Sequence, residues 1–183
     1  MRIIGGTAKG HTIKAPKGVD TRPTLDRVRE SVFNVLSNRG IFGTHVLDIF
    51  SGTGAVAIEA LSRGAAHAVA VDFKTGKLIL ENAKHCHVED RLEIIPRKLS
   101  QLKNYIMGQQ FDYIFSDPPY ENGFIQETID MVVDCDLLKP EGVLLLEHHK
   151  DEAFTLPESW KCIKEQKFGY TMVSYFVNTA ERS

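Results

Sequence analysis

Short apolar runs alternate with longer amphipathic stretches along most of this chain, beginning at residue 46. The runs are continuously apolar, which is typical of parallel strands that are buried on both faces. The stretches between them repeat apolar residues every three or four positions, as helices do. Strands are predicted at residues 46–50, 68–71, 92–95, 111–115 and 143–147, and helices in the stretch that ends near residue 64 and at residues 74–85, 99–107 and 125–133.

This alternation predicts an α/β protein with an open, doubly wound and mostly parallel sheet. Ligands of such sheets bind in a crevice at the carboxyl ends of the strands. The last two β-rich runs, residues 160–168 and 171–177, are separated only by Gly169 and Tyr170, which is the spacing of a hairpin. We therefore expect a seven-stranded sheet that includes one C-terminal antiparallel strand.

The first forty residues do not follow the alternation. Residues 2–15 contain two short apolar-bearing runs around glycines, which indicate a small hairpin or an extended arm. Apolar residues then recur every three or four positions between residues 25 and 36 and predict an amphipathic helix that leaves Arg27 and Arg29 largely off its apolar stripe. The chain is accordingly divided into an N-terminal hairpin and helix extension, residues 1–40, and a main domain, residues 41–183.

The composition is that of an ordinary globular protein. The chain has 183 residues, of which 43% are hydrophobic and 25% charged, enough for one domain with a core. No apolar run approaches the roughly 18 residues that a membrane-spanning helix needs, and no secretory signal is expected. The three cysteines follow no metal-binding or redox spacing, so a reduced, cytoplasmic protein is expected. They are Cys86, Cys135 and Cys162.

Charge is unevenly distributed although the formal net charge is only −2. Residues 1–31 carry seven basic and three acidic side chains, which leaves the rest of the chain with a net charge of −6. A basic segment on an acidic body can steer a phosphate backbone onto one end of a molecule, although a solvated surface would have the same composition. The candidate RNA-binding residues in this segment are Arg2, Lys9, Lys14, Arg22 and Arg27.

The segment DIFSGTG, residues 48–54, closes the first main-domain strand and opens a helix. Glycines allow a sharp turn and a close approach of a ligand to the backbone, and the helix behind them offers free N–H groups. Asp72 follows the next strand, 20 residues after Gly52, where a carboxylate can accept hydrogen bonds from ribose hydroxyls. The pattern fits a dinucleotide or S-adenosylmethionine. Asp48 favours the latter, because it would repel a pyrophosphate and attract the amino group of a methionine.

A second motif, Asp117-Pro118-Pro119-Tyr120, follows the strand at residues 111–115 and faces the same crevice. The prolines fix the backbone and remove two N–H donors, so this loop presents acceptors. The Asp117 carboxylate and the Pro118 carbonyl can hold both hydrogens of an exocyclic amine, and Tyr120 offers a face on which a base can stack. Holding the amine towards a sulfonium methyl would assist in-line displacement. The two motifs together indicate an amino-methyltransferase.

Four segments carry a resemblance to a known family. They are MRIIGG at the N-terminus, TRPTLDRVRESVFNVL at residues 21–36, VLDIFSGTGAVAIEALSRGA at residues 46–65 and DPPY at residues 117–120. Together they resemble the bacterial small-subunit (16S) ribosomal RNA guanine-N2 methyltransferases of the RsmD type, over essentially the whole chain. The resemblance implies a Rossmann-like class I methyltransferase fold in residues 41–183, the cofactor S-adenosylmethionine, methylation of a guanine N2, and the small ribosomal subunit or its rRNA as partner.

The resemblance also implies roles for single residues. Asp117, Pro118, Pro119 and Tyr120 match the catalytic loop of the family. The block at residues 22–27 matches a segment that lies near cofactor and target in this family. The residues expected to contact the cofactor are Asp48, Phe50, Ser51, Gly52, Gly54, Asp72, Arg22 and Thr24.

The sequence departs from the usual pattern after the strand at residues 92–95. Methyltransferases of this kind often carry a carboxylate there that binds the adenine amine, whereas residues 95–99 read IPRKL. A backbone group or another side chain would have to replace it. No metal is expected, because the histidine pairs lack carboxylate or cysteine partners at metal-site spacing. Neither a membrane nor an obligate protein partner is indicated.

Three other functions fit parts of the sequence. The acceptor of an amino-methyltransferase could be adenine in DNA or a glutamine of a protein. A non-catalytic RNA-binding assembly factor could retain the same fold. A nicotinamide dehydrogenase would explain the glycine turn, but it leaves the DPPY segment without a role.

Overall fold

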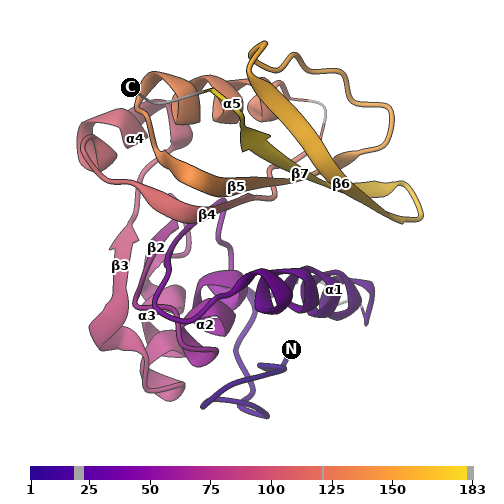
Figure 1. Cartoon of the computed structure of the whole chain (residues 1–183). Coiled ribbons are helices and arrows are strands. Elements are labelled where there is room, and N and C mark those ends of the chain that lie inside the picture. The colour runs from indigo at the N-terminus through magenta and orange to yellow at the C-terminus, as the bar shows by residue number, and fades with distance from the viewer. Residues whose placement is uncertain (19–22, 121, 181–183) are drawn as a thin grey trace.

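Seven strands form one sheet in the order β3-β2-β1-β4-β5-β7-β6 (Figure 1). This computed structural model describes residues 1–18, 23–120 and 122–180, without the side chains of residues 23 and 24. The sheet is parallel from β3 to β5, and β7 is antiparallel to both of its neighbours. The strands are β1 (His45–Ile49), β2 (His67–Val71), β3 (Leu92–Ile95), β4 (Phe111–Ser116), β5 (Leu138–His149), β6 (Trp160–Phe168) and β7 (Thr171–Asn178).

Helices cover both faces of the sheet, with α1, α2 and α3 on one face and α4 and α5 on the other (Figure 1). Their bounds are α1 (Pro23–Arg39), α2 (Ala55–Ser62), α3 (Gly76–His85), α4 (Leu99–Ile106) and α5 (Phe124–Asp134), and a 3-10 turn, η1 (Glu89–Arg91), precedes β3. In the described ranges no helix combines the length and apolarity that crossing a membrane requires. The predicted seven-stranded α/β fold with one antiparallel strand is confirmed.

The two helical layers explain why the central strands are continuously apolar. Side chains alternate between the faces of a strand, so Val46 packs among α1, α2 and α3, whereas the next residue, Leu47, packs among α4 and α5. Both side chains are buried. A polar residue at the carboxyl end of such a strand lies where the helices no longer cover the sheet, and this is where the candidate site is found.

The N-terminal arm forms a short hairpin against α1 and α2. Arg2 and Thr12 make an isolated antiparallel bridge, and the Ile3 amide donates to the His11 carbonyl at 3.0 Å. Ile3 and Ile13 are buried in the same apolar cluster as α1, α2 and α3. The expected hairpin and helix are therefore present, while the domain boundary at residue 40 stays a prediction.

Strand β5 is longer than predicted. It begins at Leu138, five residues before the expected start, and pairs with β4 through a register shift between Phe111 and Tyr113. The added segment is polar and irregular, since it contains Pro140 and Glu141 has a φ of 64°. Such residues are depleted in strands, so the apolar pattern alone could not place this start.

Candidate active site

The glycine turn between β1 and α2 has the backbone geometry that its sequence suggests. Phe50, Gly52 and Gly54 all have positive φ angles, of 60°, 59° and 81°. A Cβ atom on Gly54 would lie 3.0 Å from Cγ2 of Ile79, so glycine also lets α3 pack closely against the turn. The chain thereby turns sharply enough to bring the start of α2 over the carboxyl end of β1.

Asp48 lies under this turn and is almost completely buried. Its Oδ2 accepts hydrogen bonds from the Ser51 hydroxyl at 2.5 Å and from the Ala57 amide at 3.3 Å. Burial raises the pKa of Asp48 to about 7, and the nearby carboxylates of Asp117 and Asp72 act in the same direction. A cationic ligand group in the adjacent cavity would favour the ionised form of Asp48.

Asp72 follows β2 and connects the glycine turn to the next loop. Its Oδ2 accepts a hydrogen bond from the Gly52 amide at 3.0 Å, and its Oδ1 accepts from the amides of Lys74 and Thr75 at 2.9 and 3.2 Å. A carboxylate offers about four acceptor positions, so one remains for a ligand hydroxyl. Asp72 can therefore bind a ribose while it also holds the turn in place.

The DPPY loop follows β4 at the same edge of the sheet. Asp117 is half-buried, Pro118 is buried, and Pro119 and Tyr120 are exposed. Tyr120 is tied to β7, because its phenol oxygen lies 2.8 Å from the Thr171 hydroxyl. This bond holds the ring at the mouth of the site while it remains accessible.

Two neighbouring cavities lie along this edge. The larger, of about 450 Å³, is lined by Asp72 and by the whole DPPY loop, and the smaller, of about 250 Å³, is lined by Asp48 and the glycine turn. Phe50 and Asp117 line both cavities and thus form their common wall. The two motifs that the sequence indicated are therefore brought together around adjoining spaces, as the methyltransferase interpretation requires.

Comparison with known proteins shows the family to which this chain belongs. The family described as Conserved hypothetical protein 95 matches residues 1–177. Ribosomal RNA small subunit methyltransferase D of Escherichia coli K12 is 30% identical to this chain, and the alignment covers 99% of the chain and 91% of that protein. The chain therefore belongs to the family described as Conserved hypothetical protein 95. The resemblance to the RsmD type is thereby confirmed.

Solved structures show the same fold. The structure of yhhF from Escherichia coli has a TM-score of 0.87 and 30% identity, and 99% of each chain is covered. Ribosomal protein L11 methylase from Lactobacillus delbrueckii subsp. bulgaricus has a TM-score of 0.71 over 94% of this chain and 88% of that one. At 16% identity this second likeness concerns the fold alone. The expected class I methyltransferase fold is confirmed.

Glu147 is a residue of the site that the sequence analysis missed. It lies near the carboxyl end of β5, is only 5% exposed and lines the smaller cavity with Asp48 and Asp117. Burial, together with the charge of Asp117, raises the pKa of Glu147 to about 8. Burial likewise raises the pKa of Asp117 to about 7. A signal was available in the sequence, because a carboxylate directly follows the apolar run of a predicted parallel strand.

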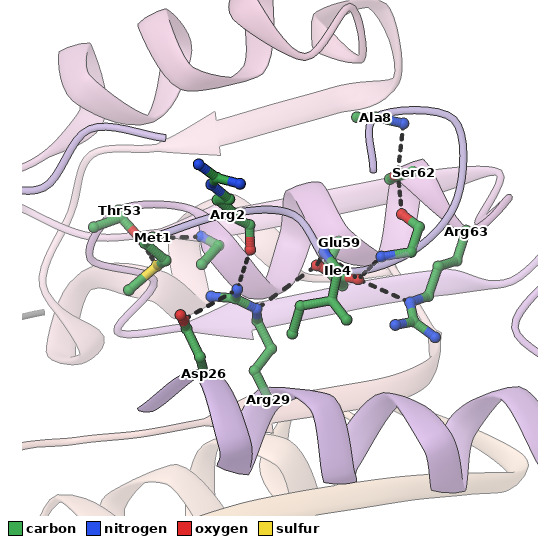
Figure 2. Close-up of polar contacts among 12 residues, drawn as sticks. Met1, Arg2, Ile4, Ala8, Asp26, Arg29, Thr53, Glu59, Ser62 and Arg63 are labelled. Carbon is green, nitrogen blue, oxygen red and sulfur yellow. Dashed lines mark hydrogen bonds and ion pairs between the residues drawn. The ribbon is translucent and has the colours of Figure 1, made fainter. Parts of the chain in front are cut away.

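The sequence pattern predicts that Arg29 lies largely off the apolar stripe of its helix. In the structure its side chain is instead buried. Figure 2 shows its guanidinium reaching from α1 to the Arg2 carbonyl and to Asp26 and Glu59. The helical pattern alone could not predict this burial, because the N-terminal arm covers this part of α1. Arg29 also lines the smaller cavity, so this ionic cluster forms part of its wall.

Glu59 of α2 is the centre of that cluster and is fully buried (Figure 2). Its carboxylate accepts hydrogen bonds from the amides of Ile4 and Gly5 at 2.9 and 2.8 Å and from Arg63 Nε at 2.9 Å. These bonds fix the N-terminal arm on α2 and place Met1 at the smaller cavity. The arm thereby completes the wall of the candidate site.

The candidate RNA-binding residues that the structure describes are exposed. They are Arg2, Lys9, Lys14 and Arg27. Lys14 is partly neutralised by an ion pair with Glu81 at 3.5 Å. Arg22 lies outside the described residues, as does the side chain of Thr24, so their predicted contacts with cofactor and RNA stay predictions.

The segment that lacks the adenine-binding carboxylate forms one end of the larger cavity. Phe73, Arg97, Lys98 and Leu99 line this end. Arg97 donates to the Tyr105 phenol at 2.9 Å, and the ammonium groups of Lys74 and Lys98 lie 5.0 and 5.5 Å from the centre of the Phe73 ring. The apolar side chains of Phe73 and Leu99 thus line this end of the cavity together with the cationic side chains of Arg97 and Lys98.

Proposed function

We propose that this chain transfers a methyl group from S-adenosylmethionine to the exocyclic N2 of a guanine in small-subunit ribosomal RNA. The observation that carries the proposal is that Asp117 lies in the common wall of two cavities, one lined by the Asp72 carboxylate and one by the glycine turn. The name of the related Escherichia coli protein supports the choice of ribosomal RNA. The cytoplasm would be the site of action, and the small subunit or its rRNA the partner.

The residues present fit S-adenosylmethionine. Asp72 would bind a ribose hydroxyl with its remaining acceptor position, and Phe73 and Leu99 would enclose the adenine. Phe50, Ser51 and Gly52, which line the smaller cavity, would contact the methionine, and Asp48 below them would favour its amino group. Gly54 would allow the turn that brings them there. When bound, the cofactor supplies a sulfonium methyl that is attacked in line by a nitrogen lone pair.

The DPPY loop would orient that nitrogen. An exocyclic amine is a poor nucleophile because its lone pair is delocalised into the ring. The Asp117 carboxylate and the Pro118 carbonyl would each accept one N2 hydrogen and so direct the lone pair at the methyl carbon. Tyr120, held by Thr171, would stack on the base once it has left its helix. As the new N–C bond would form, the C–S electron pair would stay on sulfur, and the Asp117 carboxylate would accept the proton that N2 loses, either directly or through water.

Transfer of a tritiated methyl group tests this proposal. The purified protein is incubated with small ribosomal subunits from cells that lack it, with naked rRNA, with adenine-containing DNA and with a protein carrying an accessible glutamine. Label should enter the RNA of the first or second sample, and nuclease digestion followed by mass spectrometry should identify N2-methylguanosine. Label in DNA or protein, or on another RNA atom, would contradict the proposal, and so would absence of transfer together with absence of cofactor binding.

A further inference from the structure

Three carboxylates lie near the carboxyl ends of three adjacent strands, β1, β4 and β5, on one face of the sheet. Ser116 of β4 pairs with Leu146 of β5, so Asp117 and Glu147 both stand one position beyond this pair. Asp48 of β1 pairs with Phe115 of β4, two residues before Asp117. Residues two apart on a strand share a face, and this face is the one that α1 covers. All three side chains line the smaller cavity.

Glu147 differs from Asp48 in its hydrogen bonding. Asp48 receives hydrogen bonds from Ser51 and Ala57, whereas no residue in the described part of the chain donates one to the Glu147 carboxylate. Arg29 also lines this cavity, but its guanidinium is directed at Arg2, Asp26 and Glu59. Because the Glu147 carboxylate lines the smaller cavity and the described residues offer it no donor, a ligand in this cavity can supply the donor.

Asp117 limits what that ligand can be. Under the proposed function Asp117 and Pro118 bind the N2 amine of the target base, and neighbouring parallel strands lie about 4.8 Å apart. An acceptor on β5 can therefore reach the ring atom next to the amine. In guanine the ring nitrogen beside the amine on the base-pairing edge is N1, which carries a hydrogen, whereas the corresponding nitrogens of adenine (N1) and cytosine (N3) are acceptors that a carboxylate would repel.

We propose that Glu147 accepts a hydrogen bond from N1–H of the target guanine and thereby selects guanine over bases with an acceptor at that position. This inference rests on the proposed function, since it places the base through Asp117. The N1–H donor of the base would itself favour the ionised form of Glu147 that this hydrogen bond requires. Glu147 would then be a specificity-determining residue beside the amine-binding pair.

The test compares guanine with 2-aminopurine at the position that the wild-type protein methylates. 2-Aminopurine keeps the exocyclic amine but has an acceptor at N1, and it can be placed in the rRNA by ligation before subunit assembly. The wild-type protein should show a kcat/KM at least 100-fold lower for 2-aminopurine than for guanine, because the buried carboxylate meets an acceptor. Equal rates on both bases would overturn the inference whether or not any variant folds.

Glu147→Gln and Glu147→Asp complete the test. The amide of Glu147→Gln can donate to N1 of 2-aminopurine, so the preference for guanine should fall at least tenfold. Glu147→Asp should lose rate on both bases and keep the preference. In both variants the Kd for S-adenosylmethionine, measured by calorimetry, should stay within about threefold of wild type.

Two results would overturn the inference while leaving the proposed function intact. One is an unchanged preference for guanine in Glu147→Gln. The other is a tenfold loss of cofactor affinity in Glu147→Gln without a change in preference, which would assign Glu147 to the methionine amino group. Failure of the wild-type protein to methylate guanine N2 in any RNA would instead remove the proposed function itself.

Discussion

The Nε atom of Arg29 lies 3.6 Å from Oε2 of Glu59, and both side chains are buried between α1, α2 and the N-terminal arm. The two residues are thirty positions apart in the sequence, and the amides of Ile4 and Gly5 converge on the same carboxylate. A single buried charge thus holds together three segments that surround the smaller cavity. Removing the charge of Glu59 is therefore expected to lower the free energy of unfolding.

Glu59→Gln should lower the free energy of unfolding by about 3 kcal/mol, because it leaves Arg29 buried without its main counter-charge. Urea unfolding followed by circular dichroism measures the change. Glu81→Gln is the matched control, since Glu81 forms an exposed pair with Lys14 and its loss should cost less than about 0.5 kcal/mol. Equal effects of the two substitutions would show that the cluster does not hold the arm.

Asp117→Ala should reduce methyl transfer at least 100-fold, because the target amine loses the acceptor that orients it. The Kd for S-adenosylmethionine should change little, since Asp72 and the glycine turn remain. Single-turnover transfer and calorimetry measure the two quantities. Asp130→Ala, at an exposed position on α5, is the control and should leave both unchanged. Normal transfer by Asp117→Ala would show that the DPPY loop has another role.

Tyr120→Ala should lower kcat/KM for the RNA about 10- to 100-fold, because stacking of a base on an aromatic ring contributes about 1–3 kcal/mol. Tyr120→Phe keeps the ring and loses only the hydrogen bond to Thr171, so an effect of about threefold is expected. Thr171→Val removes the same bond from the other side and should match Tyr120→Phe. If Tyr120→Phe is as impaired as Tyr120→Ala, the hydroxyl and not the stacking face is what the RNA requires.

The stability of the free protein should fall as the pH rises from about 4 to about 8. Asp48 and Asp117 have their pKa raised to about 7 and Glu147 to about 8, chiefly by burial, so the folded chain binds more protons than the unfolded chain across this range. The contribution of the neutral carboxyls is complete below the unfolded pKa values and is lost as each folded pKa is passed.

Urea unfolding at pH 5.5, 7 and 8.5 measures this trend. Glu147→Gln cannot ionise, so its stability should decline less steeply over the same range than that of the wild-type protein. Parallel curves for the two proteins would show that Glu147 is ionised in both the folded and the unfolded chain at these pH values.

The parts of this molecule that the sequence could predict are those with a local signal. Continuous apolar runs located the central strands, and strand-end motifs located Asp72 and Asp117, because parallel strands bring their carboxyl ends to one edge. The burial of Arg29 had no local signal, since the covering arm comes from another part of the chain. The start of β5 was obscured by its irregular, polar segment. The roles of the site residues stay predictions until they are tested.

The hydrogen bonds of Asp72 affect how a cofactor would bind, because they join two loops of the site. Because its carboxylate accepts amides from Gly52 on one side and from Lys74 and Thr75 on the other, the loops after β1 and β2 form one stiff unit. A ligand that lands on either loop finds the other already in position. The cofactor site should therefore be preorganised. Little conformational entropy would be lost when the cofactor binds, and its association rate would be governed mainly by diffusion into the crevice.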